Sequence, residues 1–279
     1  MNLKEAMKRK LTSKELELMP RSFDTIGTIA VLEIPRELVK KEKLIANEVL
    51  KRTSLKGVFK KSGKISGKLR TRKLKWLAGE KTKETTHVEA GCKFRLNVET
   101  CYFSPRLSND RLTVARHVKL GEKVLCLFSG VGPYPIVIAK NSKAEKVYGI
   151  ELNKVAAKYA DMNVKLNKLK NVELIQGDVK NALPKLIKKV GKFDRIMMSR
   201  PRLDEDFLVE AFSAAKDGTI IHFHDFLKGE DIPSVAYRKI EDATAKLKKH
   251  PKHYKIIKWQ KAGDIGPRRY RIRVDFRVF

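Results

Sequence analysis

The sequence is short of cysteine and has no long apolar run. Its three cysteines, Cys92, Cys101 and Cys126, show no CxxC spacing, which argues against a disulfide framework or a zinc site and favours a reducing compartment. No stretch is long and apolar enough to span a membrane, and the N-terminus lacks the apolar core of a signal peptide. We therefore expect a cytoplasmic protein with no membrane partner and no bound metal.

Acidic residues are also scarce. The chain has 32 Asp and Glu against 62 Lys and Arg, a formal net charge of +30. Such an excess favours a polyanionic partner, because each neutralised phosphate releases condensed counterions. A solvated basic surface in a heat-adapted protein is the alternative, although heat adaptation tends to balance Lys with Glu. The charge therefore favours a nucleic acid as the partner.

The order of the expected elements predicts three parts. Residues 1–19 have the pattern of a charged helix, and residues 20–98 mix short strands with one helix, as in a small basic α+β RNA-binding domain. Within this domain, 25–34 reads as one strand. Residues 99–279 alternate strands with helices and end in two strands joined by a turn. This pattern predicts an α/β, Rossmann-like domain whose parallel sheet ends in an antiparallel pair.

A third glycine is missing from the turn that follows the first strand of this sheet. In VLCLFSGVGPYPIVIA (124–139), Pro135 stands where a dinucleotide fingerprint has its last glycine, and no Gly-Lys-Ser/Thr follows. A pyrophosphate cradle and a Walker loop are therefore poorly supported. Gly130 and Gly132 still allow a ligand to approach the backbone at the carboxyl end of the strand.

Acidic residues end the next two strands. Glu151 follows the glycines by about twenty residues, where a carboxylate can accept both ribose hydroxyls. Asp178 stands where it could accept from an adenine amino group. The glycine turn and the two acids describe a nucleoside site that requires no phosphate, as in class I S-adenosylmethionine enzymes. An ordinary α/β turn with two surface carboxylates is the alternative.

Four stretches carry a resemblance to a known family: YFSPRLSNDR, LFSGVGPYPI, VYGIELN and NVKLNKLKNVELIQGDV. They resemble the archaeal and eukaryotic tRNA (guanine-N1)-methyltransferases that act at position 37, and the related aminocarboxypropyltransferases of wybutosine synthesis. The resemblance covers most of 87–226 and, more loosely, 20–86. It implies the class I S-adenosylmethionine-dependent methyltransferase fold, S-adenosyl-L-methionine as the cofactor and the tRNA anticodon stem-loop as the partner. We expect the protein to be a monomer.

The resemblance also implies catalytic roles. In the family, an acid followed by arginine after the Ser-Pro-Arg-Leu turn takes the N1 proton of guanine, and that pair is here Asp110 and Arg111, with aspartate in place of the usual glutamate. Arg111 could stabilise charge on the guanine oxygen, and Arg106 of the same turn is the third catalytic candidate. Since SND precedes a helical pattern, a helix N-cap is the alternative role for Asp110.

The remaining site residues follow from the same resemblance. The family has Asn-Leu-Pro after its fourth strand, where this chain has Ser199, Arg200 and Pro201. Serine can form one hydrogen bond with a base but cannot present a bidentate amide. We expect Tyr102 to contact the substrate together with these three residues. The expected cofactor contacts are Ser104, Arg111, Phe128, Gly130, Gly132, Glu151, Leu152, Asp178, Val179 and Ser199.

A basic run between Lys51 and Lys83 contains thirteen Lys and Arg and a single acid, Glu80. A solvated face is the alternative, but beside a suspected RNA enzyme the run favours contact with the tRNA backbone. Trp76 within it could stack on an unpaired base or pack on the domain core. The candidate RNA contacts are Lys68, Arg70, Arg72 and Lys73.

Two alternating patterns complete the candidates. His222 and His224 alternate on a strand, but without a third ligand we interpret them as structural or near the site. Arg271 and Arg273 share one face of the last strand, which we expect to be solvated.

Three functional hypotheses remain open. The first is methyl transfer to N1 of guanine 37, and the second is aminocarboxypropyl transfer to a wybutosine precursor at position 37. The third is a catalytically silent tRNA-binding module. It stays open because both departures from the family pattern, at Asp110 and at residues 199–201, fall on residues expected to take part in the reaction.

Overall fold

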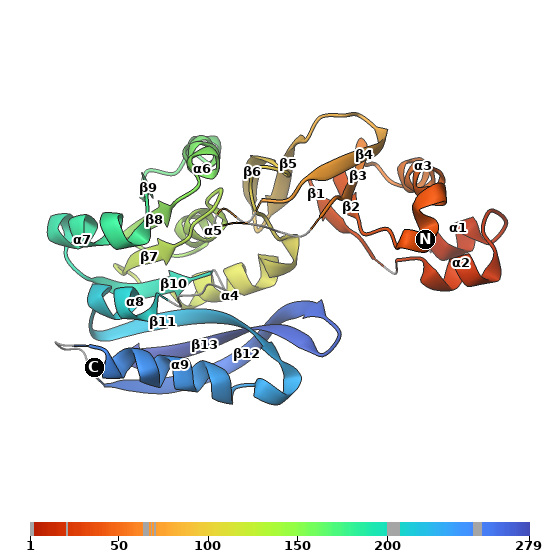
Figure 1. The fold of residues 1–279 in the computed structure, drawn as a ribbon. Helices are drawn as coiled ribbons and strands as arrows, with labels where there is room; N and C mark the ends of the chain where they lie inside the picture. The colour runs from red at the N-terminus through yellow and green to blue at the C-terminus, as the bar shows by residue number, and fades with distance from the viewer. Residues whose placement is uncertain are drawn as a thin grey trace. The chain divides into compact units, whose positions relative to one another are not determined.

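The computed structural model describes residues 3–20, 22–63, 67, 69, 71–199, 207–247 and 253–279. The chain divides into two compact units (Figure 1). One comprises Met1–Glu89 and Lys93–Pro105, and the other comprises Ala90–Cys92 and Arg106–Phe279. The division into 1–19, 20–98 and 99–279 stays a prediction.

The first unit is built on a four-stranded sheet. Its strands lie in the order β1 (Asp24–Ile26), β2 (Ile29–Leu32), β3 (Gly57–Lys61) and β4 (Leu74–Gly79), of which only β2 and β3 pair in parallel. Its core joins apolar side chains of β2, β3 and β4 to those of four helical segments. These segments are α1 (Leu3–Met7), α2 (Ser13–Leu18), η1 (Arg36–Lys41) and α3 (Glu42–Arg52). A separate hairpin pairs β5 (Glu84–Glu89) with β6 (Cys92–Asn97).

Two local predictions for the first unit are wrong. In place of one helix over the described residues 3–19, the chain forms α1 and α2, because Thr12 and Glu15 close a capping box that starts α2. Residues 25–34 form a hairpin instead of one strand. Gly27, with φ +54°, turns the chain between β1 and β2 where a Cβ would lie 2.2 Å from the Thr85 hydroxyl.

The second unit is built on a seven-stranded sheet. Its order is β12 (Tyr254–Gly266), β13 (Arg269–Val278), β11 (Ala215–Lys228), β10 (Phe193–Met198), β7 (Lys123–Leu127), β8 (Lys146–Glu151) and β9 (Val172–Gln176). The neighbours from β11 to β9 are parallel, whereas β13 runs antiparallel to both β11 and β12. The predicted parallel sheet with an antiparallel finishing pair is confirmed.

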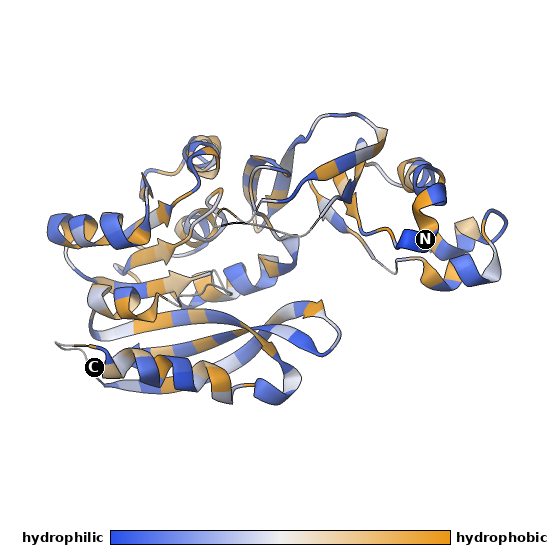
Figure 2. Ribbon diagram, in the orientation of Figure 1, coloured by the Kyte–Doolittle hydropathy of each residue, from blue (hydrophilic) through white to orange (hydrophobic). Residues whose placement is uncertain are grey.

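Helical segments precede the first of these strands and connect the later ones. They are η2 (Pro105–Leu107), α4 (Ser108–His117), α5 (Pro133–Asn141), α6 (Lys154–Leu166), α7 (Val179–Val190), α8 (Leu208–Ala214), η3 (Gly229–Asp231) and α9 (Ser234–Ala245). Buried side chains of α7, α8 and α9 form one core with the apolar side chains of the strands. The central strands β7 and β10 carry mostly the apolar colour in Figure 2. From β7, the chain continues to β8 and β9 on one side and then to β10 and β11 on the other. Ligands of open α/β sheets bind at such a switch point.

Candidate active site

The glycine turn follows the carboxyl end of β7. Phe128, Gly130 and Gly132 have φ angles of 61°, 57° and 88°, in the left-handed region. The Ser129 amide donates to the carbonyl of Ile150 on β8, at 3.0 Å. A Cβ on Gly149 of β8 would lie 3.0 Å from the Ser129 side chain, so a glycine there lets the strand approach the turn closely.

Glu151 is joined to this turn. Its Oε2 accepts from the amide of Gly130 at 2.7 Å, and its Oε1 accepts from the amide of Asn153 at 2.7 Å. A carboxylate oxygen can accept more than one hydrogen bond, so these two bonds do not by themselves exclude a further donor. The structure therefore brings together the glycine turn and the acid that the sequence predicts for the ribose.

The other candidates follow neighbouring strand ends. Asp178 caps α7 by accepting from the amide of Lys180 at 2.9 Å, and Val179 is buried in the core. Ser199 donates from its hydroxyl to the carbonyl of Phe128 at 3.3 Å. Leu152, which is half-buried, directly follows Glu151. These contacts lie beyond the carboxyl ends of β7, β8, β9 and β10, at one edge of the sheet.

This edge suits a nucleoside. It offers left-handed glycines for close approach and the carboxylates of Glu151 and Asp178 for hydroxyl and amino groups. The aromatic rings of Phe128 and Phe207 pack edge to face at 5.1 Å between centroids. Such a set of acceptors and apolar surface matches the sugar and base of a cofactor without a phosphate.

Asp110 lies in the first turn of α4 and is buried. Its Oδ2 accepts from the hydroxyl of Tyr134 at 2.5 Å and from Nε2 of His224 at 2.9 Å, and its Oδ1 accepts from Nη1 of Arg273 at 2.5 Å. Burial by itself would raise the pKa of this carboxyl, but His224, Arg273 and Tyr134 together lower it well below its ordinary value. Asp110 is therefore ionised across the physiological range.

The N-cap alternative for Asp110 is wrong. The N-cap of α4 is Leu107, whose side chain makes no capping hydrogen bond. Because α4 follows the η2 turn directly, Asp110 falls inside the first helical turn, where its side chain meets α5, β11 and β13.

The ion pairs continue away from Asp110. Arg273 also donates to both oxygens of Asp275, at 2.8 and 3.1 Å, and Asp275 accepts from Nδ1 of His222 at 2.6 Å. Nη1 of Arg195 lies 2.8 Å from Nε2 of His222, and Arg195 pairs with Glu122 at 2.7 Å. We name this set the buried network; its members are Glu122, Arg195, His222, Asp275, Arg273, Asp110, His224 and Tyr134.

The expected solvated face of the last strand is wrong. Arg271 and Arg273 are 5% and 0% exposed. Alternation shows that the two faces of a strand differ but not which face meets water. Sequence reasoning also missed Tyr134 and Arg195, for which no local pattern gives a signal, because their partners lie far away in the chain.

The other catalytic candidates lie in different surroundings. Arg111 is buried, with its guanidinium 5.8 Å from the centre of the Tyr134 ring, whereas Arg106 is exposed. Tyr102 and Ser104 belong to the first unit and stay predictions. Arg200 and Pro201 lie outside the described residues.

Several cations of the basic run have acidic partners in the first unit. Lys60 and Lys75 both pair with Glu42, Lys83 pairs with Glu99, and Arg52 pairs with Glu48. Ion pairs within the first unit therefore account for part of the basic run. Trp76 packs against a small apolar cluster and donates from Nε1 to the carbonyl of Gly79.

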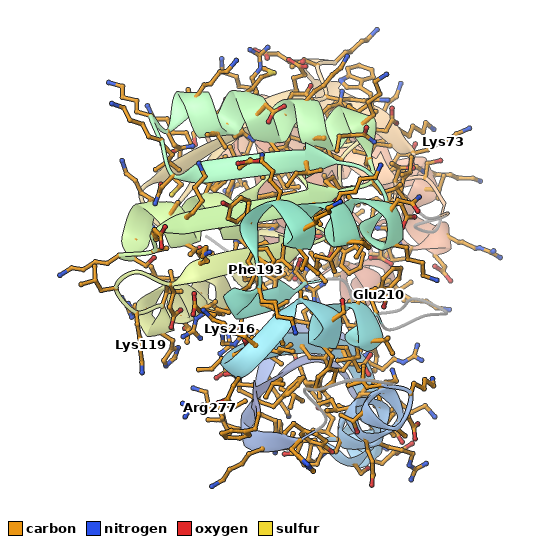
Figure 3. The ribbon with its side chains drawn as sticks, turned by 90° about the vertical axis from the view of Figure 1, so that its left-hand side faces the viewer. Lys73, Lys119, Phe193, Glu210, Lys216 and Arg277 are labelled. Atoms are coloured by element: carbon orange, nitrogen blue, oxygen red, sulfur yellow. The ribbon has the colours of Figure 1, made fainter. Side chains whose placement is uncertain are left out.

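Arg72 and Lys73 remain as described candidates for RNA contact, while Lys68 and Arg70 lie outside the described residues. Arg72 is half-buried and Lys73 is exposed. Figure 3 shows Lys73 pointing outward, as do Lys119 and Arg277 of the second unit.

In the part of the chain that the structure describes, no group of three or more His, Cys, Asp or Glu is placed to hold a metal ion. None of the helices described there is long and apolar enough to cross a membrane.

Comparison with protein families decides the assignment. Residues 85–256 match the model described as the TRM5/TYW2 methyltransferase domain, and residues 3–82 match the TYW2 N-terminal domain. The chain belongs to the TRM5/TYW2 family. The family and the S-adenosylmethionine-dependent methyltransferase fold predicted from the sequence are confirmed.

Curated relatives carry three different activities. The chain is 38% identical to the tRNA (guanine(37)-N(1))-methyltransferase Trm5b of Pyrococcus abyssi, over 93% of this chain and 76% of the relative. It is 36% identical to the tRNA (guanine(37)-N(1))/4-demethylwyosine(37)-methyltransferase Taw22 of Nanoarchaeum equitans, over 91% and 98%. It is 28% identical to the tRNA(Phe) (4-demethylwyosine(37)-C(7)) aminocarboxypropyltransferase of Pyrococcus horikoshii, over 99% and 96%.

Solved structures agree with this assignment. Trm5b of Pyrococcus abyssi has a TM-score of 0.83 at 37% identity, over 96% of this chain and 78% of that one. The complex of aTrm5 and tRNALeu has a TM-score of 0.85 at 27% identity, over 100% and 78%. TYW2 of Pyrococcus horikoshii in complex with MeSAdo has a TM-score of 0.79 at 26% identity, over 99% and 98%. The predicted cofactor, S-adenosylmethionine, is confirmed for this family of enzymes.

Proposed function

We propose that the protein transfers a methyl group from S-adenosylmethionine to N1 of guanine 37 in tRNA. The names of its Trm5b and Taw22 relatives support this reaction, and the tRNA complex of aTrm5 supports tRNA as the substrate. The net charge of +30 favours the same partner. When bound, the cofactor supplies an electrophilic methyl group.

The edge of the sheet holds the nucleoside part of the cofactor in this proposal. Glu151 accepts from the ribose hydroxyls, and the amides of Gly130 and Asn153 fix the direction of its carboxylate. Asp178 accepts from the adenine amino group. Phe128 and Ser199 lie at the turn, where the Ser199 hydroxyl donates to the Phe128 carbonyl.

The position of Asp110 carries the methyl-transfer proposal. Guanine N1 is a poor nucleophile while it keeps its proton, so a positioned carboxylate that takes the proton accelerates attack. Asp110 is held ionised, and Oδ1 keeps acceptor capacity beside its bond to Arg273. The partners that lower its pKa also weaken it as a base, so we expect its contribution near the lower end of the usual range, about 10²-fold.

Nucleoside mass spectrometry tests this proposal. Unmodified tRNA with guanosine at position 37 is incubated with the protein and S-adenosylmethionine, and a transcript with adenosine at that position is the control. We expect 1-methylguanosine from the first transcript and no modified nucleoside from the second. Methylation of both transcripts, or cofactor binding without any product, would contradict the proposed reaction.

Aminocarboxypropyl transfer is the second candidate. It is favoured by the match of residues 3–82 to the TYW2 N-terminal domain and by the near end-to-end match with the Pyrococcus horikoshii aminocarboxypropyltransferase. A parallel reaction on tRNA that carries 4-demethylwyosine at position 37 tests it. Addition of an aminocarboxypropyl group there, without methylation of guanosine, would replace the first candidate.

A further inference from the structure

Asp110 is held by donors from three separate elements. Tyr134 comes from the first turn of α5, His224 from β11 and Arg273 from β13. All three side chains are buried, and Arg273 is fully so. The carboxylate therefore has one orientation that three parts of the fold determine together.

Two of these donors connect Asp110 to the candidate active site. Tyr134 directly follows the glycine turn that ends at Gly132. Nδ1 of His224 lies 3.3 Å from the carbonyl of Met198, the residue before Ser199. The candidate base, the cofactor turn and the strand end that carries Ser199 are thus linked through two side chains.

The two histidines have different hydrogen-bond partners. Nε2 of His224 donates to the Asp110 carboxylate at 2.9 Å, and its Nδ1 faces the Met198 carbonyl at 3.3 Å. His222 meets a permanent donor, Arg195, at Nε2, so it is neutral and donates from Nδ1 to Asp275. Burial lowers the pKa of His222 to about 4, which agrees with the neutral form.

We infer that His224 and Arg273 are positioning residues that orient the Asp110 carboxylate toward the acceptor base. The identity of the transferred group rests on the proposed function, but the hydrogen bonds of Asp110 do not. Arg273 is itself fixed by its two bonds to Asp275. The charged and titratable groups around Asp110 are His224, Arg273, Tyr134, Arg111 and Arg271, with Asp275 and His222 behind Arg273.

Carboxyl titration tests the inference without any reaction. The full-length protein is labelled with ¹³C-aspartate, and the Asp110 signal is assigned by its loss in Asp110→Asn. We expect Asp110 to stay ionised in the wild type down to strongly acidic pH and to titrate at higher pH in Arg273→Gln, because a positive charge has been removed. Arg273→Lys keeps that charge, so its titration should stay close to the wild type.

Single-turnover kinetics give the second readout. At saturating S-adenosylmethionine and tRNA, we expect His224→Leu and Arg273→Gln to lower the rate about 10²-fold, the effect of a misplaced reacting group. Cofactor affinity should change little. In His224→Gln the side-chain amide can donate to Asp110, so part of the rate should return. The acid limb of the pH–rate profile should move to higher pH in Arg273→Gln.

Glu122→Gln is the matched control. It removes one charge from the far end of the buried network without touching Asp110, so stability should fall while the rate and the Asp110 titration stay unchanged. An unchanged titration and rate in folded Arg273→Gln and His224→Leu would overturn the inference. An equal loss of rate in Glu122→Gln would also overturn it, because the buried network would then support the structure as a whole and not the orientation of Asp110. If only the product differs from 1-methylguanosine, the proposed function fails and the positioning role stands.

Discussion

The carboxylate of Glu151 holds the amide of Gly130 at 2.7 Å. This bond joins the carboxyl end of β8 to the glycine turn after β7, at the point where the order of the sheet reverses. The acid therefore has two tasks in the proposed site, because it shapes the turn and presents oxygen atoms to the ribose.

Glu151→Ala should weaken S-adenosylmethionine binding by about 1.5–3 kcal/mol, because charge-assisted hydrogen bonds are lost. Binding of tRNA should change much less. Isothermal titration calorimetry with each ligand measures both effects. Glu173→Ala is the control, since Glu173 pairs with Lys189 instead of the glycine turn. Equal cofactor affinity in the two variants would remove the basis for the nucleoside site.

Asp110→Asn should lower the single-turnover rate by about 10²-fold or more, because the asparagine cannot take a proton from the base. It should also destabilise the protein by about 3–5 kcal/mol, because Arg273 and His224 lose their charged partner in a buried site. Rates must therefore be measured at a temperature where circular dichroism shows the variant folded. A folded variant with the rate of the wild type would exclude Asp110 as the base.

Neutralising Arg72 and Lys73 together should weaken tRNA binding and flatten its dependence on salt. Each lost phosphate contact should reduce the slope of log K against log salt by about 0.7–0.9. The matched control neutralises Lys8 and Lys14, two cations of the N-terminal segment, and should leave the slope unchanged. Equal slopes in both double variants would show that the basic run is a solvated face.

His222 should make stability depend on pH. Its pKa is about 4 in the folded protein, below its ordinary value of 6.5, so the folded state binds fewer protons than the unfolded state between these values. The contribution of His222 to the free energy of unfolding is therefore fully present above pH 6.5 and is lost as the pH falls toward 4. The loss is at most about 1.4 kcal/mol per pH unit. Urea unfolding at several pH values measures this dependence.

The same measurement on His222→Gln gives the comparison. The variant should have a smaller slope of unfolding free energy between pH 4 and 6.5. At lower pH both proteins should still lose stability, because the folded state lowers the carboxyl pKa values of Asp110 and Asp275. Identical slopes in the two proteins would show that His222 is not neutral and buried as the structure describes.

Much of the second unit could be predicted because its signals are local. Strands that alternate with helices gave the parallel sheet, and a glycine turn followed by an acid at the next strand end gave the pair of Gly130 and Glu151. These features depend on neighbouring residues and on connection rules that hold for every sheet of this kind.

The surroundings of Asp110 could not be predicted, because its partners are distant in the chain. Arg273 lies 163 residues away and His224 lies 114 residues away. Arg271 and Arg273 of the last strand were interpreted as solvated, although both are buried and Asp110 of α4 pairs with Arg273. The ion pairs of Glu42 and Glu48 with cations of the basic run could not be predicted either, since both acids lie outside the run.

The co-product of a single turnover tests the central proposal most directly. Transfer of the methyl group leaves S-adenosylhomocysteine, whereas transfer of the aminocarboxypropyl group leaves methylthioadenosine, whichever base accepts the group. Liquid chromatography and mass spectrometry of a reaction with unmodified tRNA distinguish the two. The account predicts S-adenosylhomocysteine in amounts equal to the 1-methylguanosine formed at position 37. Methylthioadenosine as the tRNA-dependent co-product would contradict it.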